Sequence, residues 1–154
     1  MKYILVIIAF MRSPVCCIGQ ATDPMNLNIT IDNSLVTNVD MLKVIINRQN
    51  SSDTVSADYI PGRLTSKAFE LTKESEEVKS IEINFAYNQY FQGKRKLYVY
   101  QIALPLAAIR RNYNIINIFN LDKPQNGKAF HPVNGQGYVF DYIYPGGGRL
   151  TKRI

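Results

Sequence analysis

Hydrophobic and polar residues alternate along much of this chain, which is the pattern of half-buried β-strands. The clearest segment is 78–88, and 26–32 shows the same two-residue period. Successive side chains of a strand point to opposite faces, so each segment is expected to bury one face and expose the other. The apolar faces carry Ile81, Ile83, Phe85 and Tyr87 in one segment and Leu27, Ile29 and Ile31 in the other.

Six further segments have the composition of β-strands, and turn-forming residues separate several of them. They lie at 41–47, 54–60, 69–71, 96–106, 113–121 and 138–144. Residues 66–79 fit either one or two helical turns or the polar tip of a β-hairpin. Residues 122–137 are rich in proline and glycine and are expected to form a loop.

These segments predict an all-β protein with one domain, a single antiparallel β-sandwich of about seven or eight strands. The domain covers 22–154 and ends in a basic C-terminal tail, whereas 1–21 form a segment that is processed. Strands do not alternate with helices along the chain, which argues against a parallel sheet.

The segment 96–106 is apolar on both faces, which indicates a central strand of a sheet. If it lay at an edge instead, it would favour self-association or the addition of a strand from a partner.

The first residues have the layout of a secretory signal peptide. Lys2 precedes an apolar run over 3–11, Pro14 follows, and Gly19 and Ala21 are small residues suited to cleavage. A nine-residue run is too short to cross a membrane, which takes about 20 residues in a helix. The sequence therefore predicts cleavage after Ala21 and an exported chain that is periplasmic, tethered to the outer membrane or secreted.

Two alternatives stay open at this terminus. Cys16 or Cys17 could carry a lipid, as the cysteine after the apolar run of a bacterial lipoprotein does, or the segment could be retained. The usual spacing of a leucine and small residues before a lipidated cysteine is lacking in front of both Cys16 and Cys17.

Both cysteines lie in 1–21, so the processed chain has no disulfide, cysteine nucleophile or thiolate metal ligand. His131 is the only histidine. A stable zinc site needs three or four nitrogen, sulfur or oxygen ligands from the protein. We therefore expect neither a metal nor a cofactor.

The two halves of the processed chain differ in charge. Residues 22–91 hold six basic and ten acidic residues, whereas 92–154 hold ten basic and two acidic ones. Such asymmetry indicates a charged partner, such as an anionic surface, an anionic glycan or an acidic protein. Nucleic acid is not expected for an exported protein. The candidate basic patch consists of Lys94, Arg95, Lys96, Arg110, Arg111, Arg149, Lys152 and Arg153.

A second candidate surface is aromatic. Tyr138, Phe140, Tyr142 and Tyr144 share one face of the last expected strand. If exposed, this face would bind sugar rings or a protein partner, because tyrosine is frequent at interface hot spots. If buried, it would form part of the core.

No catalytic residue is expected, because no serine lies in a Gly-x-Ser-x-Gly motif and His131 stands alone in a loop. The sequence favours an exported, non-enzymatic interaction protein of the cell envelope or extracellular space, such as a lipoprotein subunit of a bacterial secretion or envelope assembly. One alternative is a secreted module that binds carbohydrate or anionic lipid. A third is a small secreted hydrolase or toxin that uses His131, with Asp122 and Asp141 as its nearest acidic residues in the sequence.

Overall fold

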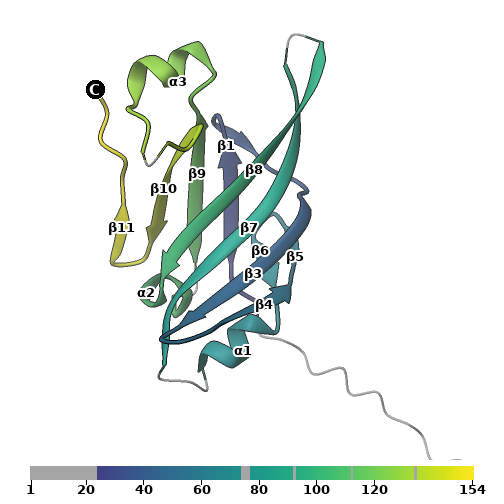
Figure 1. The fold of residues 1–154 in the computed structure, drawn as a ribbon, viewed down its shortest axis with the longest axis vertical. Helices are drawn as coiled ribbons and strands as arrows, with labels where there is room; N and C mark the ends of the chain where they lie inside the picture. Colours follow the sequence, from purple (N-terminus) through teal and green to yellow (C-terminus); the bar gives the residue numbers. More distant parts are fainter. Residues whose placement is uncertain (1–23, 74–76, 92, 112, 134) are drawn as a thin grey trace, which may run out of the picture.

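The computed structural model describes residues 24–73, 77–91, 93–111, 113–133 and 135–154. The expected signal peptide and both cysteines lie outside the described residues. Two sheets face one another and form an open β-sandwich, so the predicted all-β class and sandwich architecture are confirmed (Figure 1).

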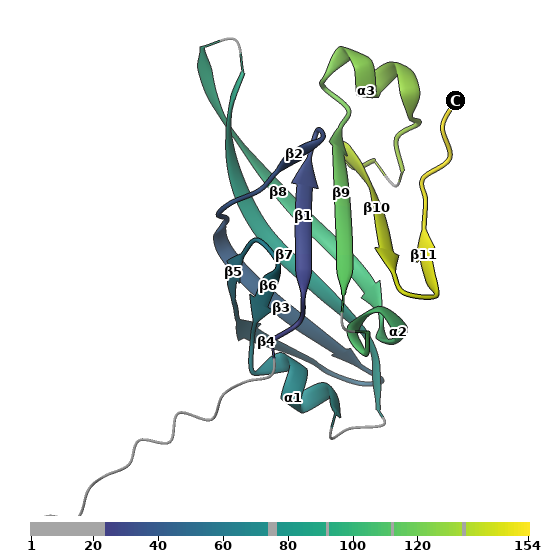
Figure 2. The same ribbon diagram turned by 180° about the vertical axis from the view of Figure 1, so that it is seen from behind.

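The first sheet has the strand order β11-β10-β9-β1-β2 (Figure 2). Its strands are β1 (Leu27–Ile31), β2 (Ser34–Leu35), β9 (Asn114–Asn120), β10 (Tyr138–Tyr144) and β11 (Gly147–Arg149). β1 and β9 are parallel, with Ile29 opposite Ile116, and the other pairs of this sheet are antiparallel. The sheet is therefore mixed, a feature that the absence of alternating strands and helices did not predict.

The second sheet is antiparallel, with the order β4-β3-β7-β8. Its strands are β3 (Asp40–Arg48), β4 (Ser52–Ser56), β7 (Val78–Phe91) and β8 (Lys94–Pro105). β7 and β8 form a long hairpin whose closed end projects beyond the rest of the sandwich (Figure 1).

The remaining elements are a short hairpin, β5 (Asp58–Ile60) and β6 (Arg63–Thr65), and three short helices. The segment expected as one strand over 54–60 is divided, because β4 pairs with β3 whereas β5 pairs with β6. The short strand expected at 69–71 is wrong, since helix α1 (Ala68–Lys73) lies there. The Ser66 hydroxyl accepts a hydrogen bond from the Ala68 N–H at 3.2 Å, and Phe69 and Thr72 are buried on one side of the helix.

The other two helices are α2 (Leu106–Ile109), directly after β8, and α3 (Pro124–Ala129), in the expected loop. Pro124 at the first turn favours the start of α3, because proline lacks the N–H that a first turn leaves unpaired. Phe130 after α3 stacks on Phe119 at 4.8 Å, and with Val139 they form a small second cluster.

The main core fills the space between the two sheets. Each of the strands β1, β3, β7, β8 and β9 contributes alternate apolar side chains, each worth about 1.5–3 kcal/mol on full burial. The largest fully buried ones include Ile29, Ile46, Ile83, Phe85, Tyr100, Ile102 and Ile116.

The glycine run after β10 forms a hairpin turn. Tyr144 pairs with Gly147 across Pro145 and Gly146, and Gly146 has a φ of 89°, which favours glycine. The run therefore forms this turn and begins β11.

Candidate functional site

β8 lies at an edge of its sheet, so the central position expected for 96–106 is wrong. The apolar residues on its second face stay exposed: Leu97 is 52% and Val99 is 60% accessible. An apolar side chain shows that a strand position tolerates burial. It does not show that another strand lies beside that position and covers it. The sequence pattern therefore overestimated how much of β8 is covered.

The backbone of β8 presents alternate residues to its free edge. Gln101 donates its N–H to the Tyr138 hydroxyl at 2.7 Å, and its C=O accepts from the same hydroxyl at 3.0 Å. Both backbone groups of Gln101 therefore point away from β7. In an antiparallel pair this direction repeats at every second residue, and the β7–β8 register has no irregularity. Arg95, Leu97 and Val99 thus direct their N–H and C=O groups to the same free edge.

One hydroxyl closes this edge at Gln101, and we call this contact the Tyr138 latch. Tyr138 belongs to β10 in the opposite sheet, is 8% exposed, and packs edge-on against Tyr100 at 5.0 Å. Burial raises the pKa of Tyr138, although the hydrogen bond with Gln101 opposes the change. The hydroxyl therefore keeps its proton at neutral pH, and it can donate and accept at the same time.

Residues 94–99 lie beyond the latch, and we call this part of β8 the open edge. The exposed side chains there include Lys94, Arg95, Leu97 and Val99. Tyr90 of β7, 75% exposed, lies opposite Arg95 in the hairpin. The open edge thus combines free backbone groups with exposed apolar and basic side chains.

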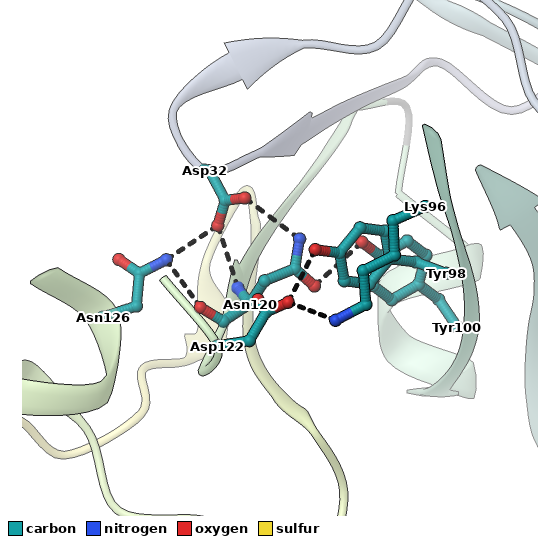
Figure 3. Close-up of polar contacts among 7 residues, drawn as sticks. All are labelled: Asp32, Lys96, Tyr98, Tyr100, Asn120, Asp122 and Asn126. Atoms are coloured by element: carbon teal, nitrogen blue, oxygen red, sulfur yellow. Dashed lines mark hydrogen bonds and ion pairs between the residues drawn. The ribbon is translucent and has the colours of Figure 1, made fainter. Parts of the chain in front are cut away.

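Side chains on the inner face of β8 fix the base of this hairpin to the body (Figure 3). The Tyr98 hydroxyl donates to the Asp122 carboxylate at 2.7 Å, and the Lys96 ammonium donates to the same oxygen. Partial burial acts to raise the pKa of Asp122, but the two hydrogen bonds and the charges of Lys96 and Lys123 outweigh it and lower the pKa. Burial and the contact with Asp122 raise the pKa of Tyr98.

A buried amide network continues from this point (Figure 3). Asp32 accepts hydrogen bonds from the backbone N–H and side-chain amide of Asn120 and from the Asn126 amide, at 2.7–3.0 Å. Asn120 in turn accepts from the Tyr100 hydroxyl at 2.9 Å. These bonds join the turn after β1 to β8, β9 and α3, so the network has a structural role.

The predicted basic residues occupy three separate places (Figure 1). Lys94, Arg95 and Lys96 lie at the hairpin end of β8, and Arg110 and Arg111 follow α2. Arg149, Lys152 and Arg153 lie in β11 and the segment after it. The structure therefore does not gather the candidate basic patch on one surface.

The third basic group lines an open cavity of about 490 Å³ together with His131. The guanidinium of Arg149 lies over the Phe140 ring at 5.9 Å, and that of Arg153 lies over the Phe130 ring at 5.7 Å. Glu82 lines a smaller neighbouring cavity of about 200 Å³, which also contains Arg149. The aromatic rings hold both guanidinium groups next to the larger cavity.

The candidate aromatic face points inward. Tyr138 is part of the core, and Phe140, Tyr142 and Tyr144 are half-buried and pack against it. Tyr142 and Tyr144 stack at 6.3 Å. This strand face therefore contributes mainly to packing, apart from the Tyr138 hydroxyl.

His131 is exposed, and the two carboxylates considered for it have other partners. Asp122 binds Lys96 and Tyr98, and Asp141 accepts from the Thr151 N–H. Within the described ranges, no three or more histidine, cysteine, aspartate or glutamate residues are grouped to hold a metal ion. No helix in the part of the chain that the structure describes has the length and hydrophobicity to span a membrane.

Comparisons with known proteins do not identify a relative. No protein-family model, no curated protein and no solved structure matches the chain.

Sequence reasoning missed the Tyr138 latch and the exposed pair Leu97 and Val99. The latch had no local signal, because Tyr138 and Gln101 are far apart in the chain and belong to different sheets. The edge position of β8 did have a signal in the sequence. Three successive cations precede Leu97, and charged residues often protect edge strands.

Proposed function

We propose that this chain is an exported, non-enzymatic interaction protein that binds an extended segment of a partner protein along the open edge of β8. The partner would belong to the cell envelope or the extracellular space. One observation carries the proposal: Arg95, Leu97 and Val99 direct backbone hydrogen-bonding groups outward, beside exposed apolar side chains. Such an edge is the template for strand addition.

The other sheet edges support the choice of β8, because each is short or polar. β2 has two residues and β11 has three, two of which are glycine. β4 consists of serine, aspartate and threonine apart from Val55. β8 is twelve residues long and carries exposed Leu97 and Val99. Folded proteins usually protect long apolar edges, and the cations at 94–96 leave the side chains of Leu97 and Val99 exposed, so this edge favours a binding role.

The proposal is tested by placing a photo-crosslinking amino acid at Val99 in cells of the source organism. The matched control places it at Thr54, which is exposed on β4 at the opposite edge of the same sheet. We expect a covalent adduct from position 99 and none from position 54. Mass spectrometry should locate the adduct in one extended segment of one partner. Equal labelling from both positions would contradict the proposal.

A second substitution separates backbone pairing from side-chain contact. Leu97→Pro removes an N–H that does not bond to β7, so the sheet should tolerate it, but it takes a donor from the open edge. Leu97→Ala keeps the N–H and removes most of the side chain. We expect the position-99 adduct to fall at least tenfold with proline and only a few-fold with alanine, at unchanged thermal stability. An unchanged adduct with proline would exclude strand addition.

Export is tested on the same purified protein by its intact mass and N-terminal sequence. A chain that starts at Thr22, or a lipid-bearing chain that starts at Cys16 or Cys17, agrees with the proposal. A chain that retains Met1 in the cytoplasm contradicts it.

A second candidate function is binding of an anionic glycan or lipid headgroup. The cavity beside Arg149 and Arg153 favours it, because two guanidinium groups are held ready for an oxyanion. Arg149→Gln with Arg153→Gln should then weaken binding to heparin or phosphatidylglycerol vesicles tenfold or more. Arg110→Gln with Arg111→Gln removes the same charge elsewhere and should have a small effect. Equal losses would indicate non-specific attraction.

A further inference from the structure

We propose that the occupant of the open edge is a short acidic strand of about six residues, and that the Tyr138 latch fixes where this strand ends. This inference rests on the proposed function. It adds the chemistry, the length and the register of the bound segment, none of which follows from an open edge alone.

The charge around the open edge indicates an acidic occupant. The sequence has no aspartate or glutamate between Glu82 and Asp122, whereas this stretch includes five basic residues. Among the described residues, no carboxylate pairs with Lys94 or Arg95, while Lys96 is already bound to Asp122. Two cations therefore remain for a partner. Opposite charges across an interface favour association and select the partner.

Arg95 is also held in position on the outer face of the hairpin. Its Nε donates to the Asn88 side chain at 2.9 Å, and the Asn88 amide donates to Asp40 at 2.8 Å. A guanidinium held through one nitrogen keeps its other donors for a second acceptor. An acidic side chain of the added strand can use these donors next to the edge.

The same charges disfavour a second copy of this chain as the occupant. Two copies that paired antiparallel along 94–99 would bring two sets of Lys94, Arg95 and Lys96 into one small interface. Asp122 of each copy offsets only one of these three cations. An acidic segment avoids this repulsion and pairs with both remaining cations.

The latch limits the length of the added strand. Among the described residues, none bonds to the outward groups of Arg95, Leu97 and Val99. At the next outward residue, Gln101, the N–H donates to the Tyr138 hydroxyl and the C=O accepts from it. Beyond it, Ala103 faces a cavity lined by residues of β10 and β11. At about 3.3 Å per residue, 94–99 accommodate a segment of roughly 20 Å. A longer partner strand would have to displace the Tyr138 hydroxyl.

The face pattern of β8 defines the composition of the bound segment. Arg95, Leu97 and Val99 share the outer face, and directly opposite residues of paired strands share a face. The added strand is therefore expected to place an acidic residue beside Arg95 and apolar residues beside Leu97 and Val99.

The experiment follows amide hydrogen exchange by NMR in the purified chain. The probe is a ten-residue peptide with valine at positions 5 and 7, glutamate at positions 9 and 10 and threonine elsewhere, so that an antiparallel strand places valine beside Val99 and Leu97 and glutamate beside Arg95 and Lys94. The matched control has lysine in place of both glutamates. With the acidic peptide we expect exchange at Arg95, Leu97 and Val99 to slow at least tenfold, with no change at Ala103. The lysine peptide should have no effect. In Tyr138→Phe, which frees the backbone of Gln101, slowing by the acidic peptide should extend to Gln101 and Ala103.

Each outcome bears on a different part of the argument. Equal slowing by both peptides would overturn the acidic occupant, and slowing at Ala103 in the unsubstituted chain would overturn the latch as a limit. Concentration-dependent slowing at 94–99 without any peptide would make a second copy the occupant. If neither peptide slows exchange while Leu97→Pro abolishes the crosslink in cells, the acidic occupant is wrong and the proposed function stands. If Leu97→Pro leaves that crosslink unchanged, the proposed function itself is wrong.

Discussion

The two parts of the free edge of β8 differ in how their backbone groups are satisfied. At Gln101 the opposite sheet reaches the edge, and a buried tyrosine hydroxyl occupies both backbone groups. Over 94–99 no residue that the structure describes covers the edge in this way, and the side chains of Lys96 and Tyr98 contact Asp122 of the body. One strand thus has a closed part and an open part.

The difference arises from strand length. β7 and β8 have fourteen and twelve residues, whereas β9 and β10 of the facing sheet have seven each. The longer pair extends past the body that would otherwise cover it (Figure 2). The mismatch in strand length therefore leaves part of the β8 edge beyond the reach of the facing sheet.

The largest effect on this comparison is expected from Tyr138→Phe. The substitution keeps the ring in the core but leaves the N–H and C=O of Gln101 without the hydroxyl. We expect the free energy of unfolding to fall by about 1 kcal/mol, the usual net value of a hydrogen bond, because water can replace part of the contact. Urea unfolding measures this loss.

Amide exchange locates the effect. The amide of Gln101 should exchange several-fold faster in Tyr138→Phe, whereas the amide of Ile102, which points toward β7, should keep its rate. Tyr142→Phe is the matched control, because it removes a hydroxyl from the same strand without touching Gln101. A similar loss of stability in both variants would assign no special role to the latch.

A smaller effect is expected from Asp122→Asn, which weakens the attachment of the open part. The ion pair is largely exposed, so its contribution should stay below about 1 kcal/mol. The pKa of Asp122 is lowered in the folded chain, so this contribution is complete above the unfolded pKa of about 4. It is lost as the pH falls through the folded pKa.

Thermal unfolding between pH 7 and pH 2 tests this sign. The unsubstituted chain should lose more stability below pH 4 than Asp122→Asn does, and the two should converge at the acidic end. The variant should also show faster amide exchange in the hairpin, near Tyr98. A constant difference between the two chains across this range would show that the carboxylate charge is not the cause.

Local alternation predicted most strands and the core they form. Ile81, Ile83 and Phe85 are buried as their period indicates, and so are Leu27, Ile29 and Ile31. The pattern indicates which face of a strand is buried, because that information is carried by neighbouring residues. It does not indicate which strands are adjacent in a sheet, and for this reason the sequence predicted a central position for β8.

The candidate site was less predictable for the same reason. The parallel pairing of β1 with β9 and the contact of Tyr138 with Gln101 join segments far apart in the chain. Helix α1 agrees with the one or two helical turns that the sequence allows at 66–79, but six residues are too few for a helical period to exclude a strand at 69–71. Cation clusters could be found in the sequence, but their separation into three places depends on the fold.

The parallel pairing of β1 with β9 has a consequence for the order in which the chain can fold. Leu27 pairs with Asn114, so β1 has no main-chain neighbour on that side until most of the chain has been synthesised. Contacts of such long sequence separation slow folding, because a large loop must close before they contribute. Until β9 is present, the apolar side chains of Leu27, Ile29 and Ile31 lack this neighbouring strand. The hairpin of β7 and β8 can form earlier, because its contacts are local. We therefore expect the parallel pairing of β1 with β9 to form late in folding.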